Sequence, residues 1–274
     1  MIYRMFLAAL TCLAAAGCAG ASGPIYEFQP TPGPLHYEII DRGNLLIETP
    51  MGEQRAIDST KATLRIEIGQ KSAGGRQISV AFETLDIWAG GDFHTEHIEG
   101  GELIGRAFTG TLSDQGIIKV TEAPEIPDAL QGSADPAAIF ADLLLPLPPT
   151  GAESADSWSH ATTRQSEGTM STEGSYEGTA RFAGDTTWNG QPARIIVSEG
   201  NTMTSGRGTP VGAPGEIEMV LRGKAVTRYI WDPSRGVMLA YQATASAEGE
   251  LEVLSMAVAM PVSYQGAKEV RLIP

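Results

Sequence analysis

The segment GVMLAYQATASAEGELEV, residues 236–253, decides the fold class of this chain of 274 residues. Leu239, Tyr241, Ala243 and Ala245 alternate along it with Gln242, Thr244 and Ser246. Residues two positions apart lie on the same face of a strand, so the alternation predicts a half-buried antiparallel strand. The side chains on the apolar face become smaller along the strand and end in alanines. Small side chains on a sheet leave room above it for a helix or a ligand.

The same alternation recurs along the chain, with turn sequences between the expected strands. It is found in KATLRIEIG (61–69), RQISVAFET (76–84) and EIEMVLR (216–222). Turns are predicted at AGGR (73–76), WNGQ (188–191) and DPSRG (232–236), and Asn189-Gly190 is the strongest hairpin signal among them. We therefore expect a mainly β fold of curved antiparallel sheets, arranged as a half-barrel or like a sandwich.

A short helix is expected near the middle of the chain, over residues 136–145. Asp135 suits its N-cap, Pro136 its first turn, and Pro146 ends it. Its apolar stripe consists of Ile139, Phe140, Leu143 and Leu144. The stripe must meet apolar surface, either as a movable lid or as fixed core, and we expect fixed core.

The helix divides the chain into an N-terminal β half (35–132), a helix and linker (133–150) and a C-terminal β half (151–274). Residues 102–120 and 224–242 share a layout of strand, polar turn, glycine and strand. This suggests two degenerate repeats, although any all-β chain offers similar hairpins.

The first residues have the features of an export signal. An apolar run over residues 6–16 follows Arg4 and is too short to span a bilayer. It ends in Ala-Ala-Gly-Cys (15–18), which resembles the lipobox of bacterial lipoproteins except that Ala15 stands where leucine is usual. The resemblance implies a signal peptide over residues 1–17 and acylation of Cys18. The alternative is an ordinary signal peptide cut after residue 21.

The location follows from the same stretch. Residues 18–34 are rich in Pro, Gly and Ala and are expected to form a flexible tether. Ala19, rather than Asp, follows the cysteine, which resembles the pattern sorted to the outer membrane, facing the periplasm, in a host with two membranes. The formal net charge of −14 disfavours nucleic acid and anionic lipid surfaces as partners, so attachment to the membrane would come from the acyl chains.

Catalytic and metal-binding motifs are sparse. HTEH (94–97) is the one close histidine pair, and its flanking glycines favour a solvated loop over a metal site. His36 and His160 fit no motif, no G-x-S-x-G occurs, and Asp232 suits a turn better than an acid role. We therefore assign no catalytic residue, metal or cofactor, and an envelope hydrolase is the least supported class.

Residues 139–158 and the hairpin at 182–197 resemble a pattern in uncharacterised exported bacterial lipoproteins. The pattern comprises an apolar helix, Leu147-Pro148, and the strand entry Asp156-Ser157-Trp158. At the level of the fold, long strands with one short helix are similar to the half-barrel lipoprotein carriers, which implies an apolar ligand. The leading expectation is a lipid-anchored envelope protein that binds an apolar or amphipathic ligand or an envelope protein. The alternative is a structural or interaction lipoprotein with a filled core.

Overall fold

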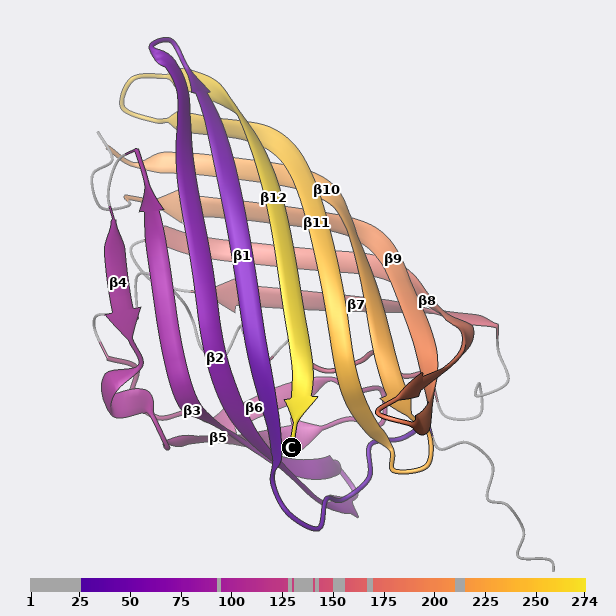
Figure 1. Cartoon of the computed structure of the whole chain (residues 1–274). Coiled ribbons are helices and arrows are strands. Elements are labelled where there is room, and N and C mark those ends of the chain that lie inside the picture. Colours follow the sequence, from indigo (N-terminus) through magenta and orange to yellow (C-terminus); the bar gives the residue numbers. More distant parts are fainter. Residues whose placement is uncertain are drawn as a thin grey trace, which may run out of the picture.

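The chain forms one continuous antiparallel sheet of 12 strands that does not close into a barrel (Figure 1). This architecture comes from a computed structural model. It describes residues 26–92, 95–127, 130, 140, 143–149, 156–166, 170–209 and 215–274. The expected mainly β fold of curved antiparallel strands is confirmed, and of the two expected arrangements the single sheet corresponds to the half-barrel.

The strands fall into two groups on either side of residues 123–156. The first group is β1 (Leu35–Thr49), β2 (Gly52–Ser72), β3 (Gly75–Gly91), β4 (Glu96–Glu99), β5 (Ala107–Leu112) and β6 (Ile118–Glu122), with a 3-10 turn at Gly101–Leu103. The second group is β7 (Ser157–Ser166), β8 (Met170–Trp188), β9 (Gln191–Gly208), β10 (Ile217–Asp232), β11 (Val237–Val253) and β12 (Val258–Ile273).

The two edge strands of the sheet are joined by the longest connection between strands in the chain. The order is β6-β5-β3-β2-β1-β12-β11-β10-β9-β8-β7, with β4 beside β3. Neighbouring strands are therefore mostly consecutive in sequence. The exception in the middle of the sheet is the pairing of the first strand, β1, with the last strand, β12. The edge strands β6 and β7 are consecutive in sequence, and the connection over residues 123–156 spans the gap between them.

The sheet curls strongly, so that β7, β8 and β9 lie across an interior space from β1, β2 and β12 (Figure 1). Large apolar side chains fill one end of this concave face, including Tyr37, Phe82, Phe108 and Trp231, each at most 2% exposed. A second apolar cluster fills the other end: Ile47, Ile217, Leu221, Leu251, Val253 and Val262. The half-barrel therefore has two cores with a separate region between them.

All three predicted turns form as expected; at the first, Ser72 pairs with Gly75 across residues 73–74. Trp188 pairs with Gln191, and the two residues between them have φ angles of 48° (Asn189) and 79° (Gly190). These left-handed conformations are those of the type I′ turn that Asn-Gly favours. In the β10–β11 turn the Asp232 carboxylate accepts hydrogen bonds from the backbone N–H groups of Ser234 and Arg235, which confirms its role as a turn residue.

The expected tether needs correction where the structure describes it. Tyr26 and Phe28 are buried, and the Phe28 ring meets that of Trp231 edge-on at 5.0 Å between ring centroids. The backbone N–H of Thr31 donates to the carbonyl of Ile68. Residues 26–31 therefore pack against the body because their aromatic side chains gain burial there, whereas residues 32–34 are exposed. The remainder of the predicted tether, 18–25, lies outside the described residues.

The expected helix is described only in part. Phe140 has helical backbone, whereas Leu143 and Leu144 already lie in a bend, so the helix ends before residue 143 and not at 145. Phe140, Leu143 and Leu144 are all buried, as the predicted apolar stripe requires. The rings of Phe82 and Phe108 lie 5.4 and 4.8 Å from the Phe140 ring, between centroids, so Phe140 belongs to the first core.

Candidate functional site

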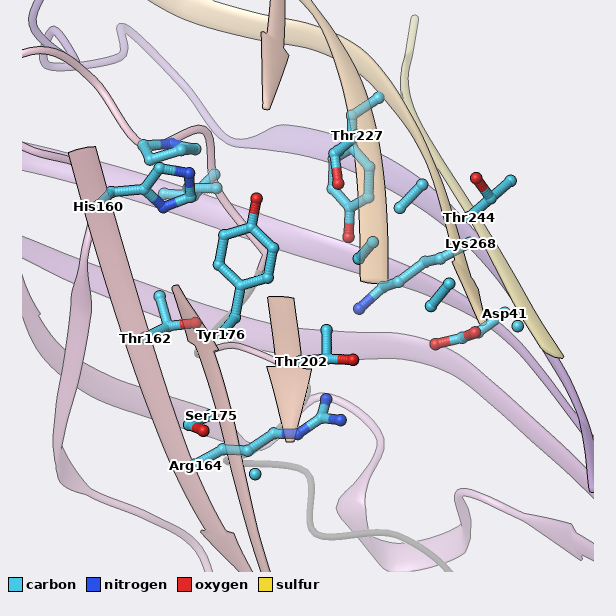
Figure 2. Close-up of a pocket in the computed structure, with 18 of the residues that line it drawn as sticks. Asp41, His160, Thr162, Arg164, Ser175, Tyr176, Thr202, Thr227, Thr244 and Lys268 are labelled. Atoms are coloured by element: carbon cyan, nitrogen blue, oxygen red, sulfur yellow. The ribbon is translucent and has the colours of Figure 1, made fainter. Parts of the chain in front are cut away.

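Between the two cores, the concave face of the sheet encloses a hollow of about 230 Å³. Its walls come from β1 and from all six strands β7 to β12, and one end is closed by the β5–β6 turn and residues 144–146. Figure 2 shows Asp41 of β1 and His160 of β7 facing this space from opposite sides. We call this region the hollow.

Small residues form part of the floor of the hollow. A single row of paired residues crosses six adjacent strands: Gly43, Gly266, Ala245, Ala225, Gly200 and Gly178. Gly266, Ala245 and Ala225 line the hollow directly. Large side chains at these positions would fill the interior, as they do at both ends of the same strands. Glycine within a strand weakens it, so a row that includes four glycines marks a close approach of other groups to the sheet.

Long polar side chains occupy the space above the glycines. The Tyr176 side chain lies over Gly178 and Gly200, and the Tyr264 side chain lies over Gly266, because a Cβ added at any of these glycines would come within 2.6 Å of an atom of the tyrosine. Asp58 lies over Gly43 in the same way, and Arg164 lies over Gly174. The glycines thus hold four polar side chains flat against the sheet and leave the middle of the hollow open.

Charged groups of both signs face the hollow. Asp41 and Lys268 are direct neighbours in the β1–β12 pairing, and Figure 2 shows the carboxylate and the ammonium group pointing into the space. Arg164 reaches into it from β7. Five threonines also line it: Thr162, Thr202, Thr204, Thr227 and Thr244.

The protein around the hollow raises the pKa of three groups, Tyr176, Asp58 and Tyr264, and for Tyr176 the main cause is burial. Burial raises the pKa of Asp58, and the nearby Asp41 carboxylate raises it further, although the Asp58 side chain keeps contact with water. Burial also raises the pKa of Tyr264 to about 12; the Asp58 and Asp41 carboxylates add to this, whereas Arg164 opposes it. Arg164 of β7 and the carboxylates of β1 and β2 therefore act on one phenol from across the hollow.

A hydrogen-bonded cluster lies at one side of the hollow. His160 Nε2 lies 2.7 Å from Ser198 Oγ, and the Tyr176 hydroxyl lies 2.6 Å from the same oxygen. A serine beside a histidine can act as a nucleophile. Ser198, however, is 1% exposed, and its backbone neighbours are paired with β8 and β10, which leaves no N–H groups beside it for an oxyanion. The cluster instead fixes the orientation of Tyr176 and His160.

The segment that closes one end of the hollow is held in place by hydrogen bonds. The backbone N–H of Leu147 donates to the carbonyl of Gln115 in the β5–β6 turn, at 3.0 Å. The Trp158 indole N–H donates to the carbonyl of Pro146, at 3.1 Å. These bonds tie residues 146 and 147 to both edges of the sheet.

The candidates singled out in the sequence lie elsewhere. Cys18 and His94 are outside the described residues. His97 belongs to strand β4 and not to a loop; it stacks on Trp88, with 4.5 Å between ring centroids, and pairs with Asp86 on the outer face. Among the described residues, no group of three or more His, Cys, Asp or Glu side chains could hold a metal ion. The described part of the chain has no helix long and apolar enough to cross a membrane.

Comparison with known proteins gives no assignment. No protein-family model matches the sequence, and no curated protein matches it with significant similarity. The functional argument therefore depends on the geometry of the hollow.

The sequence analysis missed most residues of this site. It identified Ala243 and Ala245 as a place with room above the sheet, and both line the hollow. It did not connect His160, Ser198 and Tyr176, because strand pairing between β7, β8 and β9 brings them together. The usable signal was the frequency of glycines at inward positions of long strands, such as Gly178 and Gly200.

Proposed function

We propose that this protein is a lipid-anchored binding protein of the cell envelope whose hollow receives the polar part of an amphipathic ligand. The observation that carries the proposal is the hollow itself, an open space between two filled cores of the same sheet. A purely structural lipoprotein would gain stability by filling it, at about 25 cal/mol for each Å² of apolar surface buried. Glycines and alanines keep it unfilled instead.

The lining sets the character of the ligand. Charged and hydroxyl side chains face a space whose remaining walls are apolar, and ligand sites commonly combine an apolar wall with a few placed polar groups. The volume of about 230 Å³ is below the roughly 300–1,000 Å³ usual for pockets that enclose drug-sized ligands. The hollow therefore suits the head of an amphipathic molecule rather than a purely apolar ligand, with any chain directed outward.

The anchoring part of the proposal depends on Cys18. Cys18→Ala should release the protein from membranes, because the acyl chains supply the attachment and the acidic chain gains none from anionic lipids. The measurement is the fraction in the membrane pellet after a high-salt wash, compared with Cys12→Ala, which changes the cysteine inside the expected signal peptide. Retention of the Cys18→Ala protein in the pellet would contradict the anchor.

The ligand part is tested by identifying what the protein carries. The released Cys18→Ala protein, purified without detergent from the soluble fraction, should yield an amphipathic molecule at close to one per chain in mass spectrometry. A Gly178→Leu variant, whose leucine side chain would occupy the place of Tyr176, should yield much less. An empty wild-type hollow, together with failure to bind any added amphiphile, would favour the structural alternative.

A further inference from the structure

The charged side chains of the hollow come from different strands on its two sides. On the β7 side lies Arg164, with His160 farther along the same strand. On the β1–β2 side lie two carboxylates: Asp41 lines the hollow, and Asp58 lies over Gly43. Figure 2 shows Arg164 and Asp41 entering the hollow from different sides. A molecule in the hollow thus meets Arg164 on one side and, on the other, the carboxylates with Lys268 beside Asp41.

These charges are held in place by the sheet. Arg164 lies along Gly174, its partner in the β7–β8 pairing, and Asp58 lies over Gly43, its partner in the β1–β2 pairing. A side chain supported in this way loses less conformational freedom when a ligand arrives, which strengthens binding. Tyr264 lies on Gly266, the next glycine of the same row, and its pKa responds to Asp58 and Arg164 in opposite directions.

We propose that the polar group bound in the hollow is a zwitterion, with a phosphate or carboxylate directed toward Arg164 and an ammonium group toward Asp41 and Asp58. This inference rests on the proposed function and specifies its ligand. Arginine binds phosphate and carboxylate groups through two parallel N–H donors, which suits it to the anionic end.

The presence of both signs of charge favours a head that carries both. Among the described residues, Arg164, Lys268 and Asp41 line the hollow and Asp58 lies beside it over Gly43, so a bound head meets charges of both signs. Lys268 and Asp41 are also direct neighbours across β1 and β12, whereas Arg164 comes from β7 and Asp58 from β2. A head with one charge would leave one side of the hollow facing a like charge or none.

The experiment compares short-chain phospholipids that differ only in the head. Isothermal titration of residues 19–274, which contain every described strand, uses dihexanoyl phosphatidylethanolamine and dihexanoyl phosphatidylglycerol below their micelle concentrations. We expect the ethanolamine lipid to bind about tenfold more tightly. Equal affinity, or preference for the glycerol lipid, would overturn the zwitterion, whereas binding of neither lipid would count against the proposed function itself.

Two variants test the anionic end and the ammonium end of the head separately. Asp58→Asn keeps the shape of the side chain on Gly43 and should lower affinity for the ethanolamine lipid about tenfold while leaving the glycerol lipid unchanged or tighter. Arg164→Gln should weaken both lipids. Glu177→Gln, on the outer face of β8, is the matched control and should change neither affinity. Equal losses of both lipids in Asp58→Asn, with an unchanged melting temperature, would contradict the ammonium site.

Removing the acyl chains shows whether the zwitterion is a lipid head or a free small molecule. Phosphoethanolamine alone carries the same charges without a lipid. Binding as tight as that of the ethanolamine lipid would identify a free small molecule as the ligand, and binding at least tenfold weaker would identify a lipid head.

Discussion

A single strand, β11, passes through two kinds of interior. At one end Tyr241 is buried in the first core, and at the other Leu251 and Val253 are buried in the second. Between them the inward positions hold Ala243 and Ala245, which line the hollow. The strand has the same alternation throughout, so the size of the inward side chains, and not the fold, decides where the half-barrel is filled and where it is open.

The first core and the hollow also differ in what their polar groups contact. In the first core the Tyr37 hydroxyl donates to the carbonyl of Met238 at 2.7 Å, inside a well-packed interior. In the hollow Tyr176 and Tyr264 lie on glycines at the edge of open space. The core uses a polar group to complete its packing, whereas the hollow presents polar groups to whatever enters it.

The largest expected effect tests the filled region. Phe140→Ala should reduce the free energy of unfolding by about 3–5 kcal/mol, because the ring is 1% exposed and meets two other phenylalanines. Urea titration measures the loss. Ile57→Ala, at an exposed position on the outer face, is the control and should cost under about 0.5 kcal/mol. A loss well under 1 kcal/mol for Phe140→Ala would instead indicate a movable lid.

A smaller effect is expected from adding one methyl group to the floor of the hollow. A Cβ at Gly200 would lie 2.4 Å from the carbonyl oxygen of Glu177 and 2.6 Å from the Tyr176 ring. Gly200→Ala should therefore cost about 1–3 kcal/mol and displace Tyr176. Thermal unfolding checks the cost, with Asn201→Ala on the outer face as control. An unchanged melting temperature would show that the glycine row is not needed for close packing.

The smallest effect concerns pH. The raised pKa of Asp58 means that the folded state holds this proton more tightly than the unfolded state, so stability falls as pH rises above about 4 and then stays lower. Asp58→Asn removes this cost and should stabilise the protein by less than about 1 kcal/mol at pH 7.5. The gain should vanish at pH 3.5. Melting temperatures at both pH values decide it, and destabilisation at pH 7.5 would contradict the account.

The sequence predicted the strands well because their signals are local. Leu64, Ile66 and Ile68 share a buried face as the alternation requires, and Asn189-Gly190 forms its turn from two residues alone. The burial of Phe140 also followed from its apolar stripe. Each of these depends on residues close together in the chain.

The hollow could not be predicted in the same way. Its glycine and alanine row depends on the register of six strands, from Gly43 to Gly266 and on to Gly178, and register is set by the whole sheet. His160 and Ser198 are 38 positions apart, and only the pairing through β8 brings them together. The burial of Tyr26 and Phe28 was missed because their surroundings are rich in Pro and Gly, which is typical of a tether.

The most direct test of the central claim is to fill the hollow. Ala245→Phe places a large ring on its floor, and Ser246→Phe places the same ring on the outer face of the same strand. Titration with the tighter of the two short-chain lipids should show saturable one-to-one binding for wild type and Ser246→Phe, and none for Ala245→Phe, which should remain as stable as wild type. Undiminished binding by a folded Ala245→Phe protein would contradict the claim that the hollow is the ligand site.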